Sequence, residues 1–195
     1  NPGFKLSVGL LREVIYALIY GDLILIVANQ VRPYELTSGD TDKAVQTCMD
    51  FLLQDMECGK GMTFRSMRAN FDRIINTFKA VPVSGKQKIK VGIVGEIYVK
   101  YAPLGNNNLA DFLLAEGVEP VIPGVIDFII FKINNREVDV GLYGGKWIKE
   151  KLCHWLQKYV MKYQHAMIDS LNQSGRFRAP GDFDALHRGI KGYLG

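Results

Sequence analysis

Polar and charged side chains gather in residues 96–108, EIYVKYAPLGNNN, directly after a short apolar run. They comprise a carboxylate, a phenol, an amine and three amides: Glu96, Tyr98, Lys100, Asn106, Asn107 and Asn108. In an open parallel sheet a ligand binds beyond the carboxyl ends of the strands. Because this loop follows a predicted strand, it lies where a ligand would bind. The free N–H groups at the start of the next helix suit a phosphate or a carboxylate. The pattern therefore predicts a ligand-binding loop.

The familiar nucleotide-binding motifs do not occur around this loop. The run GIVGE is neither GxGxxG nor a phosphate loop, and SGKQ at 84–87 lacks both the upstream glycine and the following Ser or Thr of such a loop. The three asparagines also have a purely structural interpretation, because Asn caps helices and tolerates the left-handed backbone conformation. Both interpretations of the asparagines stay open.

The cysteines and histidines specify no catalytic or metal site by their spacing. Cys48 lies in an apolar helical stripe and Cys153 beside Trp155, which favours buried, inert thiols, whereas Cys58 is the one expected to be exposed. Three histidines show no metal-ligand spacing: His154, His165 and His187. We therefore expect no metal and identify no catalytic residue. An odd number of cysteines without a CxxC pair also favours the reducing cytoplasm over a secreted disulfide framework.

The elements around the loop predict a small α/β unit. Residues 90–95 have the short apolar character of a buried parallel strand, residues 109–117 form a helix ending at a glycine, and residues 118–123 form the next strand. Strand, loop, helix and strand make a βαβ unit. Residues 124–135 are either a helix or a strand, and residues 146–172 are a long helix. We expect an α/β fold, a small Rossmann-like or flavodoxin-like parallel sheet wrapped by helices.

Residues 1–83 are predicted to be a mostly helical region that packs on the same core as an α/β region at 84–195. Apolar stripes at steps of three and four predict amphipathic helices over residues 41–56 and 63–80. The segment VPVSGKQK at 81–88 has the composition of a linker.

Residues 14–31 are apolar enough to raise the question of a membrane span. Asp22 lies in their centre, and an ionisable group there costs about 2.5–3.5 kcal/mol of insertion free energy, which argues against a span. Two alternatives remain. One is a long buried helix over residues 7–30, and the other is a hairpin that turns at Gly21 and Asp22.

Composition limits the classes of protein to which the chain can belong. Its 195 residues are 48% apolar, which suits one ordinary domain or two small ones and excludes a disordered chain. The net charge is only +4, so nucleic acid is not an expected partner. Residues 86–195 carry all of the excess positive charge, with 15 basic against 11 acidic side chains. No signal peptide is readable, and the abrupt start without Met suggests part of a longer protein.

Two segments resemble a known family. VGIVGEIYVKYAPLGNNNLADFLLAEGVEPVIPGVIDF at 91–128 resembles a characteristic segment of the 2-hydroxyacyl-CoA dehydratase superfamily, in particular of the large activase-related proteins of anaerobic bacteria. VRPYELTSGDTDKA at 31–44 resembles the same proteins, and together the matched parts cover most of residues 10–135. The combination of GEIYVKY and GNNN is the more specific part. The resemblance carries over these positions as loop-shaping or ligand-facing residues: Arg32, Pro33, Tyr34, Glu35, Gly95, Glu96, Tyr98, Lys100, Asn106, Asn107 and Asn108.

The resemblance implies part of an enzyme system rather than a complete enzyme. Such proteins resemble an ATP-hydrolysing activase fused to a dehydratase-like portion. The activase passes an electron, through an iron-sulfur cluster held by cysteines, to a dehydratase that removes water from a 2-hydroxyacyl-CoA. This chain resembles only the dehydratase-like portion, so we expect binding of acyl-CoA or of a dehydratase partner protein. An iron-sulfur cluster and ATP belong to the full-length parent. The alternative is a non-catalytic protein-interaction or regulatory α/β module.

Overall fold

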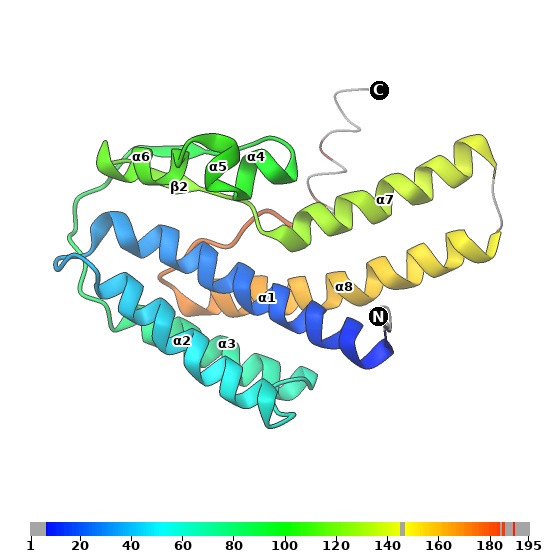
Figure 1. The fold of residues 1–195 in the computed structure, drawn as a ribbon, viewed down its shortest axis with the longest axis horizontal. Coiled ribbons are helices and arrows are strands. Elements are labelled where there is room, and N and C mark those ends of the chain that lie inside the picture. The colour runs from blue at the N-terminus through cyan, green and yellow to red at the C-terminus, as the bar shows by residue number, and fades with distance from the viewer. Residues whose placement is uncertain (1–6, 145–146, 184, 186–188, 190–195) are drawn as a thin grey trace, which may run out of the picture. The chain divides into compact units, whose positions relative to one another are not determined.

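The computed structural model describes residues 7–144, 147–183, 185 and 189. The chain forms two compact units, Asn1–Ile122 and Pro123–Gly195. The first unit contains, in chain order, α1 (Val8–Val31), the 3-10 helix η1 (Arg32–Tyr34), α2 (Asp40–Glu57), α3 (Phe64–Lys79), β1 (Lys90–Gly92), α4 (Ile97–Tyr101), α5 (Pro103–Asn106), α6 (Leu109–Ala115) and β2 (Glu119–Val121) (Figure 1). The second unit contains α7 (Val125–Tyr143) and α8 (Trp147–Ser174). The expected linker at 81–88 lies inside the first unit.

The expected Rossmann-like or flavodoxin-like α/β fold is wrong. In the part of the chain that the structure describes, helices predominate and the one sheet has two strands of three residues each. The main reason is residues 124–135, for which the sequence left helix and strand open. They belong to the long helix α7, so no third strand extends the sheet. A continuous apolar run does not distinguish a buried strand from a buried helix, because neither shows a polar face.

The βαβ unit itself is confirmed. Strands β1 and β2 pair in parallel, with Lys90 opposite Glu119 and Gly92 opposite Val121. The connection between them is more ordered than expected, because the predicted loop contains the short helices α4 and α5 ahead of α6. These short helices fix the positions of the side chains that follow β1.

The apolar segment at the start of the chain is a single helix, not a hairpin. Ser7 begins α1 by accepting the N–H of Leu10 at 3.1 Å through its Oγ. Such a cap satisfies one of the N–H groups that a helix start leaves free. Gly21 lies within the helix. Within the described ranges, no helix combines the length and the apolar character needed to span a bilayer.

Helices α1, α2 and α3 pack together around an apolar core (Figure 1). The largest fully buried side chains of these helices are Tyr20, Phe71, Phe78, Ile19, Leu23, Met67 and Ile74. A polar cluster joins the helices. The Tyr20 hydroxyl donates to the Gly61 carbonyl at 2.6 Å and accepts from Asn70. The Arg73 guanidinium donates to the side chains of both Asn70 and Asp55. Burial raises the pKa of Tyr20 to about 12, so this hydroxyl keeps its proton near neutral pH.

In the second unit, α7 and α8 form an antiparallel helical hairpin (Figure 1). Gln164 of α8 is fully buried and donates to Asp127 of α7, which links the two helices. The long helix predicted at 146–172 is confirmed as α8, Trp147–Ser174. His187, whose spacing predicted no metal role, lies outside the described residues.

Candidate functional site

Three of the predicted site residues line one small cavity, which we call the loop pocket. Its volume is about 140 Å³, and its walls comprise Leu25, Lys100, Tyr101, Pro103, Asn106, Asn108, Ala110, Asp111 and Ile122. Lys100, Asn106 and Asn108 were predicted. Leu25 and Asp111 were not, because Leu25 lies on α1, far away in the sequence, and Asp111 fits the acidic first turn of a helix as well as a site.

The short helices after β1 place these side chains through local hydrogen bonds. Glu96 begins α4 by accepting the N–H of Val99 at 3.2 Å. Asn106 donates to the Val99 carbonyl at 2.8 Å and accepts the N–H of Leu109 at 3.2 Å, so both ends of its amide are engaged within the protein. Asn107 and Asn108 have φ angles of 54° and 55°, the left-handed conformation that Asn tolerates. The structural interpretation therefore applies to all three asparagines, and Asn106 and Asn108 also border the pocket.

Glu96 and Tyr98 do not line the loop pocket. Glu96 serves as the cap of α4, and Tyr98 is 54% exposed. The Tyr98 ring lies against Gly105, where a Cβ atom would be 2.6 Å from Cε1 of the ring. That separation is too short for two carbon atoms, so the glycine makes room for the tyrosine. Of the six candidate residues at 96–108, the pocket therefore brings together Lys100, Asn106 and Asn108.

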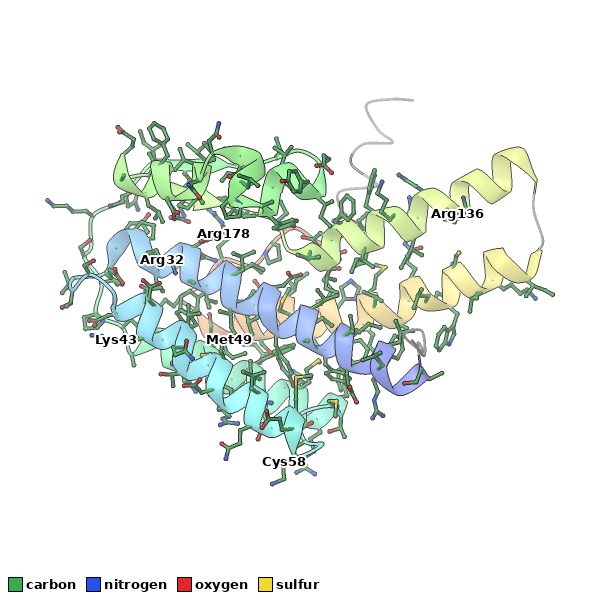
Figure 2. The ribbon with its side chains drawn as sticks, in the orientation of Figure 1. Arg32, Lys43, Met49, Cys58, Arg136 and Arg178 are labelled. Carbon is green, nitrogen blue, oxygen red and sulfur yellow. The ribbon has the colours of Figure 1, made fainter. Side chains whose placement is uncertain are left out.

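Arg32, Tyr34 and Glu35 lie at the corner between α1 and α2 and not at the loop pocket. Arg32 pairs with Asp42 at 2.7 Å, near the start of α2 (Figure 2). Tyr34 donates its hydroxyl to Oε2 of Glu119 on β2 at 2.7 Å. Glu35 accepts the N–H groups of Gly39 and Thr41, each at 2.8 Å. These residues hold the corner together and fasten it to the sheet.

Glu35 serves as the cap of α2 in place of the N-cap residue itself, which is Gly39. Partial burial alone would raise the pKa of Glu35, but the hydrogen bonds from Thr41 and Gly39 outweigh it and hold the pKa below its ordinary value of 4.5. A carboxylate at a helix start is also favoured by the helix dipole. The ionised form of Glu35 therefore stabilises the fold.

We expect Glu35→Gln to lower the free energy of unfolding by about 1 kcal/mol at pH 7, the usual cost of a lost helix cap. A lowered pKa stabilises the folded state fully above the unfolded value of 4.5, and this contribution disappears as the pH falls through the folded pKa. The difference between wild type and variant should therefore shrink in acid. Urea denaturation from pH 7 to pH 3 measures it. Glu116→Gln, an exposed carboxylate on the same unit, is the control, and an equal effect in both variants would contradict the assignment.

A second cavity, which we call the lysine pocket, lies beside the α1–α2 corner. It has a volume of about 330 Å³ and is lined by Tyr34, Ser84, Gly85, Lys86, Gln87, Lys88 and Lys90. Of the predicted site residues, Tyr34 borders it. Residues 81–88 were expected to be a linker, although the alternate lysines in KQKIK were an available signal of a site. In an extended segment alternate side chains share a side.

Cys48 and Cys58 are too far apart to hold one iron-sulfur cluster. Cys48 and Cys58 are separated by ten residues along and at the end of α2, which places them about 15 Å apart at 1.5 Å per residue. Cys58 is exposed at the far end of α2 (Figure 2). Burial raises the pKa of Cys48 to about 11, which opposes the thiolate form that a metal needs. No group of three potential metal-ligating side chains occurs among the described residues.

Comparisons with known proteins identify no relative of this chain. No family model matches it, and no curated protein or solved structure is significantly similar to it. The assignment of a function accordingly depends on the segments at 31–44 and 91–128 and on the geometry of the two pockets.

Proposed function

We propose that this chain is the dehydratase-like domain of a CoA-substrate-specific activase system in the cytoplasm. It contributes the binding of an acyl-CoA, or of a dehydratase partner protein, and not complete catalysis. The proposal is supported by the resemblance of residues 91–128 to 2-hydroxyacyl-CoA dehydratases. The observation that carries it is that Lys100, Asn106 and Asn108, all from this segment, line one pocket.

The polar groups of the loop pocket suit the acyl end of the substrate. The Lys100 ammonium and the Asn108 amide donate hydrogen bonds of the kind that a thioester carbonyl accepts. The Asp111 carboxylate accepts a hydrogen bond of the kind that a 2-hydroxyl group donates. A volume of about 140 Å³ is smaller than the roughly 300–1,000 Å³ typical of complete ligand sites, so the pocket suits a short acyl group and not the nucleotide end of CoA.

A protein-interaction module is the second candidate function. Large apolar side chains are exposed on and around the short helices: Val94, Ile97, Leu104 and Phe112. Exposed apolar side chains in a group are characteristic of surfaces that contact another protein. On this hypothesis the asparagines shape the backbone only, and the loop pocket has no small-molecule ligand.

A titration with acyl-CoA separates the two functions. We expect CoA and a short 2-hydroxyacyl-CoA to raise the melting temperature of the chain, with the hydroxyacyl compound more effective. A ligand at one hundred times its dissociation constant stabilises the folded state by about 2.7 kcal/mol, which a thermal-shift measurement detects. The double variant Lys100→Ala, Asn108→Ala should lose the additional effect of the hydroxyacyl group.

The matched control is Lys60→Ala, Asn76→Ala, which removes the same side-chain types from exposed positions of the same unit. It should bind as the wild type does. If neither CoA compound shifts the melting temperature of the wild type, or if the control and the pocket variant respond alike, the acyl-CoA function is wrong and the interaction module is favoured.

A further inference from the structure

We propose that the lysine pocket binds the diphosphate group of a phosphate ester. The inference rests on that pocket alone and is independent of what the loop pocket binds. CoA and nucleoside diphosphates share the diphosphate chemistry, and a cavity of about 330 Å³ is large enough for this group with part of its ester.

The backbone places the lysines on one cavity. Lys86, Lys88 and Lys90 occupy alternate positions of a segment that leads into β1, and all three line the pocket. Gln87, between Lys86 and Lys88, lines the pocket as well, whereas Ile89, between Lys88 and Lys90, does not line it and is 74% exposed. The sequence KQKIK therefore gathers positive charge where the surface is concave.

A buried carboxylate beside the pocket, Glu119, already has a hydrogen-bond donor and a cation as partners. Glu119 is 2% exposed, accepts the hydroxyl of Tyr34 at 2.7 Å and lies 3.4 Å from the ammonium of Lys90. Among the described residues, neither Lys86 nor Lys88 forms an ion pair with a carboxylate. Their two positive charges thus exceed the negative charge nearby, and an anion with several negative charges complements them.

Backbone donors add to the lysines. The segment is held at its start, where the Ser84 N–H donates to the Tyr34 carbonyl at 2.7 Å, and at its end, where the Glu119 N–H donates to the Ile89 carbonyl at 2.8 Å. Within the described residues, the N–H groups of residues 85–88 donate to no other protein group. Nothing lies within 4 Å of a Cβ built on Gly85, so a ligand can approach the backbone there. Phosphate oxygens accept from both kinds of donor.

Calorimetric titration at low ionic strength with inorganic pyrophosphate, CoA and ADP tests this inference. We expect the wild type to bind pyrophosphate, and the variant Lys86→Gln, Lys88→Gln to bind it at least tenfold more weakly, because two charge-assisted contacts are lost. The variant Lys86→Arg, Lys88→Arg keeps the charges and should stay within about threefold of the wild type. The control Lys60→Gln, Arg68→Gln removes two charges from exposed positions of the same unit and should bind as the wild type does.

The relative affinities of CoA and ADP identify which ester carries the diphosphate, and tighter binding of either one than of pyrophosphate supports the inference where the variant Lys86→Gln, Lys88→Gln loses it. The inference is overturned if the wild type binds none of the three compounds at millimolar concentration, or if the lysine variant and the control bind pyrophosphate equally. Failure of pyrophosphate to bind leaves the acyl-CoA hypothesis for the loop pocket intact, because that hypothesis is tested separately with the Lys100→Ala, Asn108→Ala variant.

Discussion

Phe71→Ala is expected to lower the free energy of unfolding of the first unit by about 3–5 kcal/mol, the usual cost of removing a buried phenylalanine side chain. Phe71 is completely buried on α3, and its ring meets the ring of Tyr20 edge to face, with centroids 5.9 Å apart. The variant loses apolar burial, the aromatic contact and packing density together. Urea denaturation followed by circular dichroism should show a midpoint lower by about 1 M or more, with an unchanged slope.

The control for this variant is Phe112→Ala, which removes the same atoms from a side chain that is 58% exposed. Its effect should stay within about 0.5 kcal/mol, because exposed substitutions away from special contacts rarely cost more. Similar destabilisation by both variants would contradict the position of the core between α1, α2 and α3.

Helices with a clear polar face were predicted well from the sequence. The stripes in residues 41–56 and 63–80 correspond to α2, Asp40–Glu57, and α3, Phe64–Lys79. Each helix has one buried face and one solvent-exposed face. Its apolar residues therefore recur at the helical period, and this pattern predicts the helix directly. Thr63 and Ser66 also form a capping box at the start of α3, which was not predicted.

The segments that misled the prediction are those with apolar residues on all sides. Residues 14–31 left helix and hairpin open, and residues 124–135 left helix and strand open. In both places the structure is a long helix, α1 and α7. Because packing partners and not local pattern decide such segments, the number of strands was not determined by the sequence, and the class of fold depended on that number.

Three of the candidate site residues lie together. Lys100, Asn106 and Asn108 line one pocket because they are close in the sequence and follow one strand. Residues 32–35 were expected to shape a loop or face a ligand, and the structure shows Arg32 and Glu35 in hydrogen bonds that hold the α1–α2 corner. The lysine pocket was missed because its walls come from two segments, Tyr34 and residues 84–90, which only the tertiary fold brings together.

Tyr34→Phe is expected to lower the free energy of unfolding by about 1.5–3 kcal/mol, the range for a hydrogen bond to a charged group. Without the hydroxyl, the Glu119 carboxylate, 2% exposed, loses a donor at 2.7 Å while staying away from water. The same variant keeps the aromatic ring that borders the lysine pocket. Its effect on stability therefore reports on the hydrogen bond at the corner and not on the loss of the ring from the pocket wall. Chemical denaturation measures the effect.

A double-mutant cycle with Glu119→Gln shows whether the energy belongs to this contact. The amide is similar in shape to the carboxylate and retains an oxygen that accepts the Tyr34 hydroxyl, but it loses the charge that faces Lys90. If the hydroxyl acts on the buried charge, Tyr34→Phe should cost clearly less in the Glu119→Gln background than in the wild type. Additive effects of the two substitutions would mean that the Tyr34 hydroxyl does not act on the charge of Glu119. A negligible cost of Tyr34→Phe in the wild type would mean that the α1–α2 corner is not fastened to β2 through this hydrogen bond.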